Sequence, residues 1–374
     1  MKSFASFVIA ALTAISPGIS HASGQLSFGI TAPYTKVGGA APLWNPSQTH
    51  AAVSGNDVYV AYGETTASGD EEVLVGHSAD GGLTWDAGTV VAHGPSLVPT
   101  GAIAIGPDPL APGAQIVHVV FGTMTDAYGN GTISYMHLRS GAWSAPVVVN
   151  VNPATADSGA VAVDGGGGLY IVWADATGIY TSRSGDGGDG FYVLGENVVQ
   201  GGSRPSVAAD SIGDQFVAWA DDAGVWFSSR SYRGFTFGAP VYAGNGQKGG
   251  SPVLVALDAN RMYIGYDWGM ALGEFGIALS TSTDGGATFT SRNVVVGQTG
   301  HVGLAVSSTG VISLANDSSG VVVQRSTNGG ATWTAPVTVA SAGSEYPSLA
   351  LASGKLVVAY DKQPGQAVYA TKEK

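Results

Sequence analysis

Polar residues that can transfer protons or hold an anion recur immediately before short apolar segments of this chain. In chain order they are His50, Asp157, Arg204, His301, Glu345 and Tyr346. A histidine can act as a general base and a tyrosine as a general acid, while a planar guanidinium binds a carboxylate through two parallel hydrogen bonds. We treat these six as candidate catalytic residues, and the competing interpretation of each is a structural partner for a neighbouring strand.

A second group of polar residues closes apolar segments. Glu64, Asp175, Asp221 and Asp267 are selected from it as candidate site residues, and Asp317 and Asp361 also belong to it. An aspartate at a strand end commonly caps the following turn by accepting hydrogen bonds from its own backbone. If several instead face one cavity, their repulsion raises some pKa values and makes an acid–base pair or a cation site possible. Trp268 is expected in a long loop after its strand, where an exposed indole can stack on a sugar ring. The four selected acids and Trp268 are candidate ligand-binding residues.

Seven similar apolar segments must position these residues. They start at Ala51, Gly101, Gly159, Pro205, Pro252, Val302 and Pro347. Second strands follow after Gly, Asn or Asp turns, as in Val58–Tyr62 and Leu169–Trp173. A repeat of about 50 residues, as between these segments, is typical of the four-stranded blade of a β-propeller. The last unit ends after about three strands, so we expect the N-terminal strand within 25–37 to complete it and close the ring.

The turns carry one recurring phrase, found cleanly in three places: Ser78–Trp85, Ser282–Phe289 and Ser326–Trp333. In each, an Asp or Asn can accept backbone hydrogen bonds, paired glycines supply positive φ, and the final aromatic packs under the hairpin. A degenerate copy lies at Ser184–Phe191. The phrase resembles the Asp-box, or BNR repeat, of sialidase-like β-propellers, and we interpret it as a fold element with no catalytic role.

The resemblance and the repeats together predict an all-β, seven-bladed β-propeller with Asp-box turns, forming a single domain over residues 23–374. Six blades, as in sialidases, are the alternative if the unit at 94–148, with its insertion Pro107–Pro112, is not a blade. In the resembled family the boxes lie on the face away from the active site. The candidate catalytic residues should therefore line the central funnel on the other face.

The resemblance also implies roles at that funnel. Sialidases hold the substrate carboxylate with three arginines and attack the anomeric carbon with a tyrosine assisted by a glutamate, while an aspartate serves as acid/base. The segment Tyr346–Asp361 is similar to the sialidase segment around that tyrosine, which makes Tyr346 the candidate nucleophile. The arginines depart from the pattern, because His50 stands where the first would be expected and only Arg204 starts a first strand with arginine.

Other functions remain open for the same funnel. A histidine base, Tyr346 as acid and Arg204 on a uronate carboxylate would form the β-elimination site of a polysaccharide lyase. Without catalysis, exposed aromatic residues and carboxylates would bind sugars, or the propeller would bind another protein. The sequence therefore predicts a propeller that binds or processes extracellular or cell-envelope glycans, with an exo-sialidase or other glycoside hydrolase, a lyase and a non-catalytic interaction propeller as alternatives.

Composition restricts the setting of this function. A short positive start, an apolar stretch and the segment Ser20–Ala22 predict a signal peptide over residues 1–22 and a secreted or periplasmic protein. There is no cysteine, so the fold must depend on its own core. The net charge of −12 argues against nucleic acid as a partner, and no later segment predicts a membrane anchor. No cofactor or metal is expected, since a degenerate box explains Gly185–Asp189 without calcium.

Overall fold

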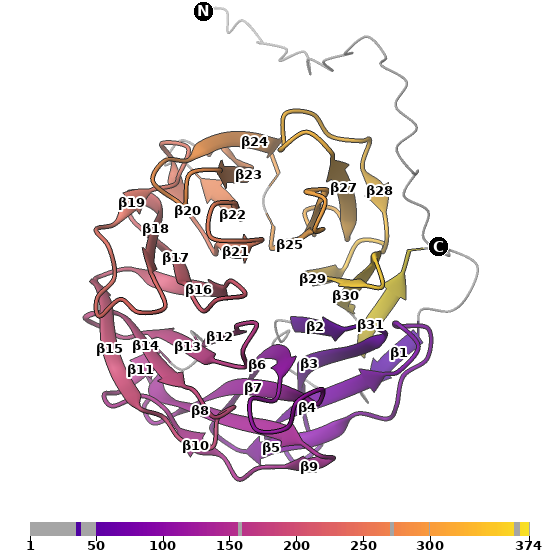
Figure 1. The fold of residues 1–374 in the computed structure, drawn as a ribbon. Helices are drawn as coiled ribbons and strands as arrows, with labels where there is room; N and C mark the ends of the chain where they lie inside the picture. Colours follow the sequence, from indigo (N-terminus) through magenta and orange to yellow (C-terminus); the bar gives the residue numbers. More distant parts are fainter. Residues whose placement is uncertain are drawn as a thin grey trace, which may run out of the picture.

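The computed structural model describes residues 35–38, 50–155, 159–269, 273–298, 300–362 and 367–373. All regular elements within these segments are β-strands, and they form seven antiparallel sheets. Figure 1 shows the sheets around a central opening, with one edge strand of each nearest the centre. The chain is therefore an all-β propeller, as the sequence predicted.

In four of the seven sheets, consecutive strands pair in chain order from the centre outward. The first sheet contains β2 (His50–Ser54), β3 (Asp57–Thr65), β4 (Glu71–Ser78) and β5 (Thr89–Gly94). The second contains β6 (Leu97–Pro107), β7 (Gln115–Met124), β8 (Asn130–Arg139), β9 (Ala142–Trp143), β10 (Val147–Val148) and β11 (Ala154–Thr155). The third contains β12 (Ala160–Val163), β13 (Leu169–Ala174), β14 (Gly178–Ser184) and β15 (Val193–Gln200). The fourth contains β16 (Ser203–Ala209), β17 (Gln215–Asp221), β18 (Gly224–Arg230) and β19 (Val241–Tyr242).

The sixth sheet repeats this plan, whereas in the fifth the first two strands pair with the same neighbour, and the last sheet takes its outer strand from earlier in the chain. The fifth contains β20 (Lys248–Gly249), β21 (Val253–Ala256), β22 (Met262–Gly269), β23 (Phe275–Ser282) and β24 (Thr290–Val296). The sixth contains β25 (Val302–Val306), β26 (Ile312–Asn316), β27 (Val322–Ser326) and β28 (Val337–Thr338). The last contains β29 (Ser344–Ala352), β30 (Lys355–Lys362), β31 (Ala367–Lys372) and, as its outer strand, β1 (Thr35–Gly38). The antiparallel pairing of β1 with β31 confirms that an N-terminal strand completes the last unit.

Hydrophobic side chains fill the spaces between neighbouring sheets. One buried cluster joins Ala315 and Val323 of the sixth sheet to Val358 of the last. Another joins Val60 of the first sheet to Val357 of the last, so the ring is also closed by side-chain packing. Each fully buried aliphatic side chain contributes about 1.5–3 kcal/mol. Because both faces of each sheet are covered, the inner strands have nearly continuous apolar sequences.

The boxes are turn elements, as predicted. In the copy around Asp284, the carboxylate accepts hydrogen bonds from Ser282 Oγ at 2.8 Å and Thr288 N–H at 3.0 Å. Hydrogen bonds from Thr288 and Ser282 lower the pKa of Asp284 to about 2. Gly285 N–H also donates to Asn260 O, in the turn that ends the inner strand of the same sheet. The boxes therefore lie at the face where inner strands end, opposite the face where they start.

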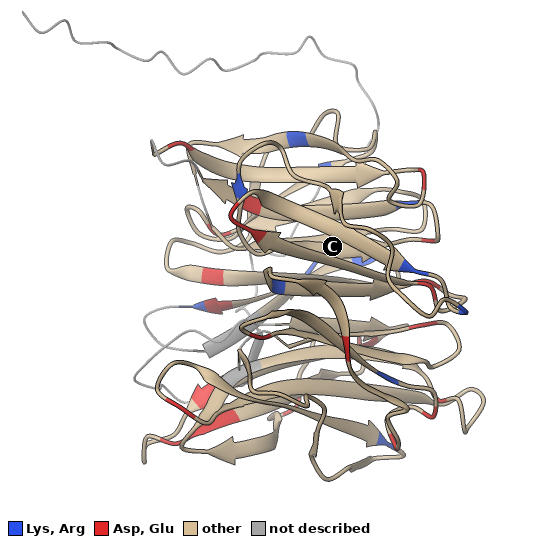
Figure 2. Ribbon diagram, turned by 90° about the vertical axis from the view of Figure 1, so that its left-hand side faces the viewer, with Lys and Arg blue, Asp and Glu red and all other residues tan. Residues whose placement is uncertain are grey.

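Many of the charged residues lie near strand ends and turns, on both faces of the ring (Figure 2). The acidic net charge is consequently distributed around the molecule. None of the described segments forms a helix that could traverse a lipid bilayer.

Candidate functional site

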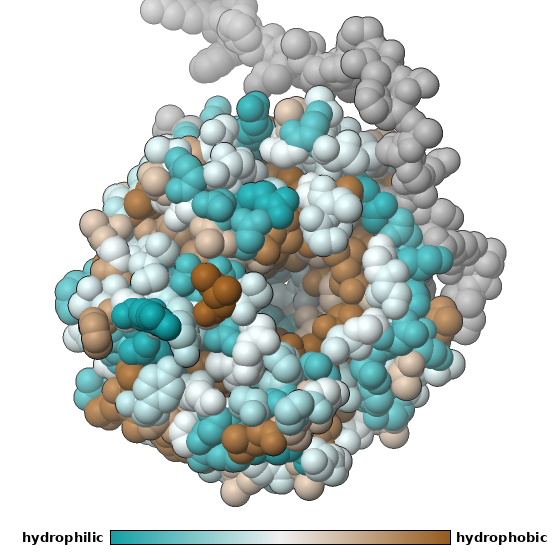
Figure 3. All heavy atoms as spheres, viewed as in Figure 1, coloured by the Kyte–Doolittle hydropathy of each residue, from teal (hydrophilic) through white to brown (hydrophobic). Residues whose placement is uncertain are grey.

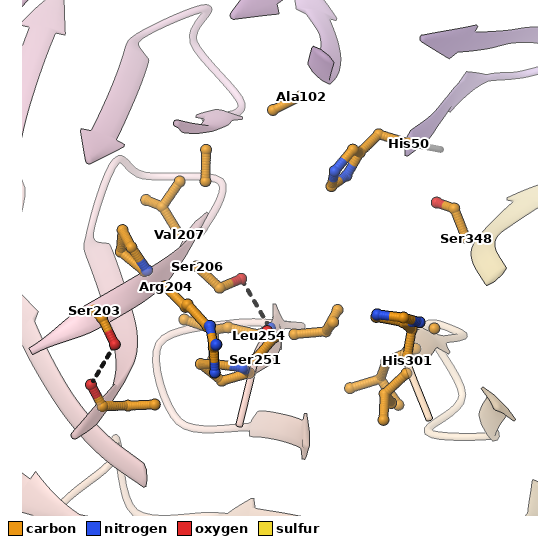
Figure 4. Close-up of a pocket in the computed structure, with 18 of the residues that line it drawn as sticks. His50, Ala102, Ser203, Arg204, Ser206, Val207, Ser251, Leu254, His301 and Ser348 are labelled. Atoms are coloured by element: carbon orange, nitrogen blue, oxygen red, sulfur yellow. Dashed lines mark hydrogen bonds between the residues drawn. The ribbon is translucent and has the colours of Figure 1, made fainter. Parts of the chain in front are cut away.

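A cavity of about 900 Å³ opens where the inner strands start, and its walls come from all seven sheets. Figure 3 shows the hollow at the centre of the ring. Five of the predicted site residues line it, and they are His50, Arg204, Asp221, His301 and Tyr346. In Figure 4 the side chains of His50, Arg204 and His301 extend from three different sheets into the same open space.

Two of these residues have an unusual backbone. Arg204 has φ of 52° and Tyr346 has φ of 53°, in the left-handed region that non-glycine residues seldom adopt. Each stands at an irregularity of the strand pairing and precedes a proline, which normally favours an extended conformation at this position. The following serines fix the bulges to the next sheet: Ser206 Oγ accepts from Leu254 N–H at 3.0 Å, and Ser348 Oγ from Ala51 N–H at 2.9 Å. Strain of this kind occurs most often at functional sites.

Arg204 supplies an available positive charge to the cavity. Its side chain is exposed, and no carboxylate of the described residues lies within ion-pair distance of its guanidinium. Nearby on the cavity wall, Lys248 pairs with the carboxylate of Asp222. An arginine without a protein partner can bind a planar anion such as a carboxylate through two hydrogen bonds.

On another part of the wall, His301 and Tyr346 lie face to face. Their ring centroids are 3.8 Å apart with an angle of 27° between the planes. His301 Nδ1 lies 2.8 Å from Asp317 Oδ2, and the Asp317 side chain is only 4% exposed. Because this carboxylate can only accept, the Nδ1 atom carries a hydrogen, and in the neutral ring Nε2 is then the atom with the lone pair. The cavity thus contains a potential base beside a tyrosine hydroxyl.

Burial sets the protonation of two cavity residues. Burial, followed by the negative charges of Glu345, Asp317 and Asp361, raises the pKa of Tyr346, which keeps its hydroxyl protonated. Burial lowers the pKa of His50 to about 4, so that its imidazole is neutral at physiological pH. A protonated phenol and a neutral imidazole are the forms needed for a general acid and a general base.

The other predicted residues lie elsewhere or have turn contacts. Glu345 lies on β29 opposite Asp361, and Glu64 lies on β3 opposite Glu72, and neither lines the cavity. Asp175 accepts from Thr177 N–H at 2.6 Å and so caps the turn after β13, whereas Asp267 accepts from Ser251 N–H at 2.9 Å and so links β22 to the segment before β21. Asp221 reaches the cavity but also accepts from Ala223 N–H at 2.7 Å. Asp157 lies outside the described residues.

Trp268 differs from the expectation. It belongs to strand β22, pairs with Gly249 and Gly276, and is only 4% exposed. The strand continues past Asp267 because β20 and β23 pair with it on both sides, and a Cβ on Gly276 would clash with the indole. The prediction of an exposed, sugar-stacking indole is therefore wrong, and Trp268 is part of the hydrophobic core between two sheets.

Asp317 was expected at the funnel face as a strand-end acid but was not selected as a site residue. It follows β26 directly and had the same signature as Asp267, an acid at a strand end. The useful signal was spacing: Asp267 follows Ser251 by 16 residues, and Asp317 follows His301 by 16 residues. This spacing pairs a strand-end carboxylate with the cavity residue of its own sheet.

Calcium at Gly185–Asp189 has no support from the local contacts. Asp186 accepts from Ser184 Oγ at 2.7 Å and Gly190 N–H at 2.9 Å, as in the other boxes, and Asp189 pairs with Arg139. Within the described ranges, three or more potential ligands from His, Cys, Asp and Glu never gather at one point.

Comparison with known proteins identifies relatives by structure alone. No family model matches the sequence, and no curated protein matches it. A solved structure of an α-L-arabinofuranosidase of glycoside hydrolase family 93 from Fusarium graminearum, with arabinobiose, is similar at TM-score 0.55 and 12% identity. That match covers 91% of this chain and 98% of the other.

Two further solved structures are similar to this chain over most of its length. A mutant of the NanB sialidase from Streptococcus pneumoniae matches at TM-score 0.54 and 11% identity, over 92% of this chain and 71% of its own. A protein of unknown function from Dyadobacter fermentans matches at TM-score 0.53 and 12% identity, over 87% of this chain and 94% of its own. At sequence identities this low, the structural similarity shows a shared fold and does not assign a reaction. The chain has the sialidase-like β-propeller fold.

Proposed function

We propose that this chain is a secreted or periplasmic propeller that binds or processes extracellular or cell-envelope glycans in its central cavity. The fold is shared with a sialidase and an arabinofuranosidase, which supports a glycan as the class of ligand. Export rests on the predicted signal peptide over residues 1–22, with residues 23–374 forming one domain. We further propose seven blades, supported by seven sheets and by a hydrophobic cluster between each neighbouring pair.

The glycan that the cavity fits best carries a carboxylate. The observation behind this proposal is Arg204, whose exposed guanidinium faces the cavity without a carboxylate partner among the described residues. Among the described residues that line the cavity, Arg204 is the one arginine. A sialidase clamp of three arginines therefore lacks support, and a single arginine suits a uronate whose other contacts are neutral.

The chemistry that these residues favour is β-elimination. His301 Nε2 would take the proton from the carbon next to the uronate carboxylate while Arg204 stabilises the charge that develops there. The bond from the neighbouring carbon to the glycosidic oxygen would then break. Tyr346, held protonated by its raised pKa, would donate its proton to the departing oxygen. The products would be an unsaturated uronate and a shortened glycan.

A screen of glycans tests the proposal. We expect binding of oligouronates by calorimetry and an increase in ultraviolet absorbance from the unsaturated product, with fluorogenic sialosides cleaved at no more than trace rates. Arg204→Ala should weaken oligouronate binding by about 10- to 100-fold, because a charge-assisted hydrogen bond contributes about 1.5–3 kcal/mol. Arg261→Ala is the control, since Arg261 pairs with Asp258 at a turn on the box face.

The outcomes separate the alternatives. Robust sialoside cleavage that Tyr346→Phe abolishes would support the exo-sialidase function and contradict the role given to Arg204. Glycan binding without cleavage would support a lectin-like propeller. Equal oligouronate affinity in the parent and in Arg204→Ala would reject the carboxylate site.

A further inference from the structure

We propose that Asp317 is a positioning residue that fixes His301 as the Nδ1–H tautomer and holds Tyr346 beside it. For its catalytic meaning this inference rests on the proposed function. The tautomer itself is a property of the unliganded protein and can be measured without any glycan.

One buried carboxylate receives three hydrogen bonds. Asp317 Oδ1 accepts from His301 N–H at 2.7 Å. Asp317 Oδ2 accepts from His301 Nδ1 at 2.8 Å and from Tyr346 N–H at 2.9 Å. An ionised carboxylate has no hydrogen to donate. The His301 ring and the two backbone N–H groups must therefore all be donors. In the neutral ring, the second nitrogen, Nε2, is then the acceptor.

The equivalent residue of the neighbouring sheet shows what a purely structural role requires. Asp267 Oδ1 accepts from Ser251 N–H at 2.9 Å, at the same separation of 16 residues along the chain. This bond corresponds to the one from His301 N–H to Asp317. Among the described residues, Asp267 has no contacts that correspond to those of Asp317 with the His301 ring and with Tyr346, so the role that the two aspartates share does not account for them.

The contact with Tyr346 joins two sheets. Asp317 and His301 flank β26 and β25 of the sixth sheet, whereas Tyr346 lies on β29 of the last. The hydrogen bond to Tyr346 N–H stabilises the left-handed backbone at φ of 53°, which in turn stacks the phenol on the imidazole. The same carboxylate thus sets both the tautomer of His301 and its distance from the hydroxyl of Tyr346.

Gly300 leaves room for the Asp317 carboxylate to lie close to the backbone. A Cβ at this position would overlap Asp317 Oδ1, and Gly250 stands in the same relation to Asp267. Gly300→Ala should therefore displace Asp317 while leaving the carboxylate in the protein. Gly250→Ala applies the same steric change to the neighbouring sheet.

Nitrogen-15 NMR of the histidine side chains, at slightly alkaline pH and without ligand, tests the proposal. The His301 signals are assigned with His301→Gln. We expect protonated Nδ1 and unprotonated Nε2 for His301 in the parent. Asp317→Asn cannot accept all three hydrogen bonds, so this signature should be lost or mixed, and Gly300→Ala should change it in the same direction. Asp267→Asn and Gly250→Ala should leave the His301 signals unchanged.

An Nε2–H tautomer or a doubly protonated ring in the parent would overturn the proposal. Equal effects of Asp317→Asn and Asp267→Asn would also overturn it, because the effect would then be general to aspartates at strand ends. If Asp317→Asn does not fold, the parent spectrum and Gly300→Ala decide the question. A protein that shows the expected tautomer but binds no oligouronate would contradict the proposed function and leave the role of Asp317 intact.

Discussion

At the scale of single residues, the histidines occupy two contrasting environments. The His301 side chain is 45% exposed at the cavity and is paired with a carboxylate. His118 is fully buried in the second sheet, where its Nδ1 lies 2.7 Å from Tyr135 Oη. An exposed, oriented imidazole can exchange a proton with a ligand, whereas a fully buried one contributes mainly to the pH dependence of stability.

His118 should make the protein less stable in mild acid. Burial, together with the positive charges of His137 and Arg139, lowers the pKa of His118 from 6.5 to about 3. Between these values the unfolded chain binds a proton that the native state does not, so the free energy of unfolding falls as pH falls through this range. We expect thermal melting to show this decrease and His118→Phe to have a flatter profile.

A buried residue of the same strand without a titratable group provides the control for this experiment. Val120→Ala, on β7, should lower the stability and keep the slope of the parent, because Val120 is 1% exposed and binds no proton. Coincident slopes for the parent and His118→Phe would show that other groups govern the acid sensitivity.

The sequence predicted the cavity residues better than their roles. Residues before the inner strands were predictable, because repeat spacing alone brings them to one end of the ring, and His50, Arg204, His301 and Tyr346 all reach the cavity. The position of Trp268 was not predictable, because the length of β22 depends on its pairing with β20 and on glycines in other strands. The extra contacts of Asp317 depend on the rotamer of His301 and on the bulge at Tyr346, which spacing does not specify.

At the scale of elements, the boxes are local structures that the sequence largely determines. Within each clean copy, one Ser, one Asp or Asn and one Thr satisfy the turn by hydrogen bonds between residues four positions apart or fewer. The terminal aromatic then attaches the hairpin to the core. This explains why the phrase could be interpreted correctly from sequence alone, whereas contacts between sheets could not.

Trp333→Ala should destabilise the fold without affecting the cavity. The indole packs against the cluster formed by Leu279, Leu304 and Leu314, and its removal should cost about 3 kcal/mol. Urea denaturation would measure this cost, and oligouronate affinity of the folded fraction should remain that of the parent. Leu83→Ala, in the turn of another box, is the control, because Leu83 is 60% exposed and its loss should change stability by less than about 0.5 kcal/mol.

Selective loss of binding in Trp333→Ala at unchanged stability would mean that the faces are assigned in reverse. The hydrogen bond between Gly285 and Asn260 places a box beside the end of an inner strand, so this outcome would also contradict the topology.

At the scale of the whole molecule, the ring is closed by two kinds of contact between the chain ends. On the inner side, Ser348 Oγ accepts from Ala51 N–H, and buried residues of the first and last sheets pack together. On the outer side, β1 covers the backbone of β31. An uncovered edge strand exposes unpaired N–H and C=O groups that can pair with another molecule.

Deleting residues 23–38 should therefore open the outer edge while the inner contacts remain. We expect a lower melting temperature and concentration-dependent association through β31, measured by calorimetry and light scattering. A shorter deletion of residues 23–34, which retains β1, is the matched control and should melt as the parent does. If the longer deletion melts cooperatively at the parent temperature and stays monomeric, then packing between the first and last sheets is sufficient for closure. In that case β1 contributes nothing to the stability of the ring, and the seven inner strands alone hold the cavity residues in place.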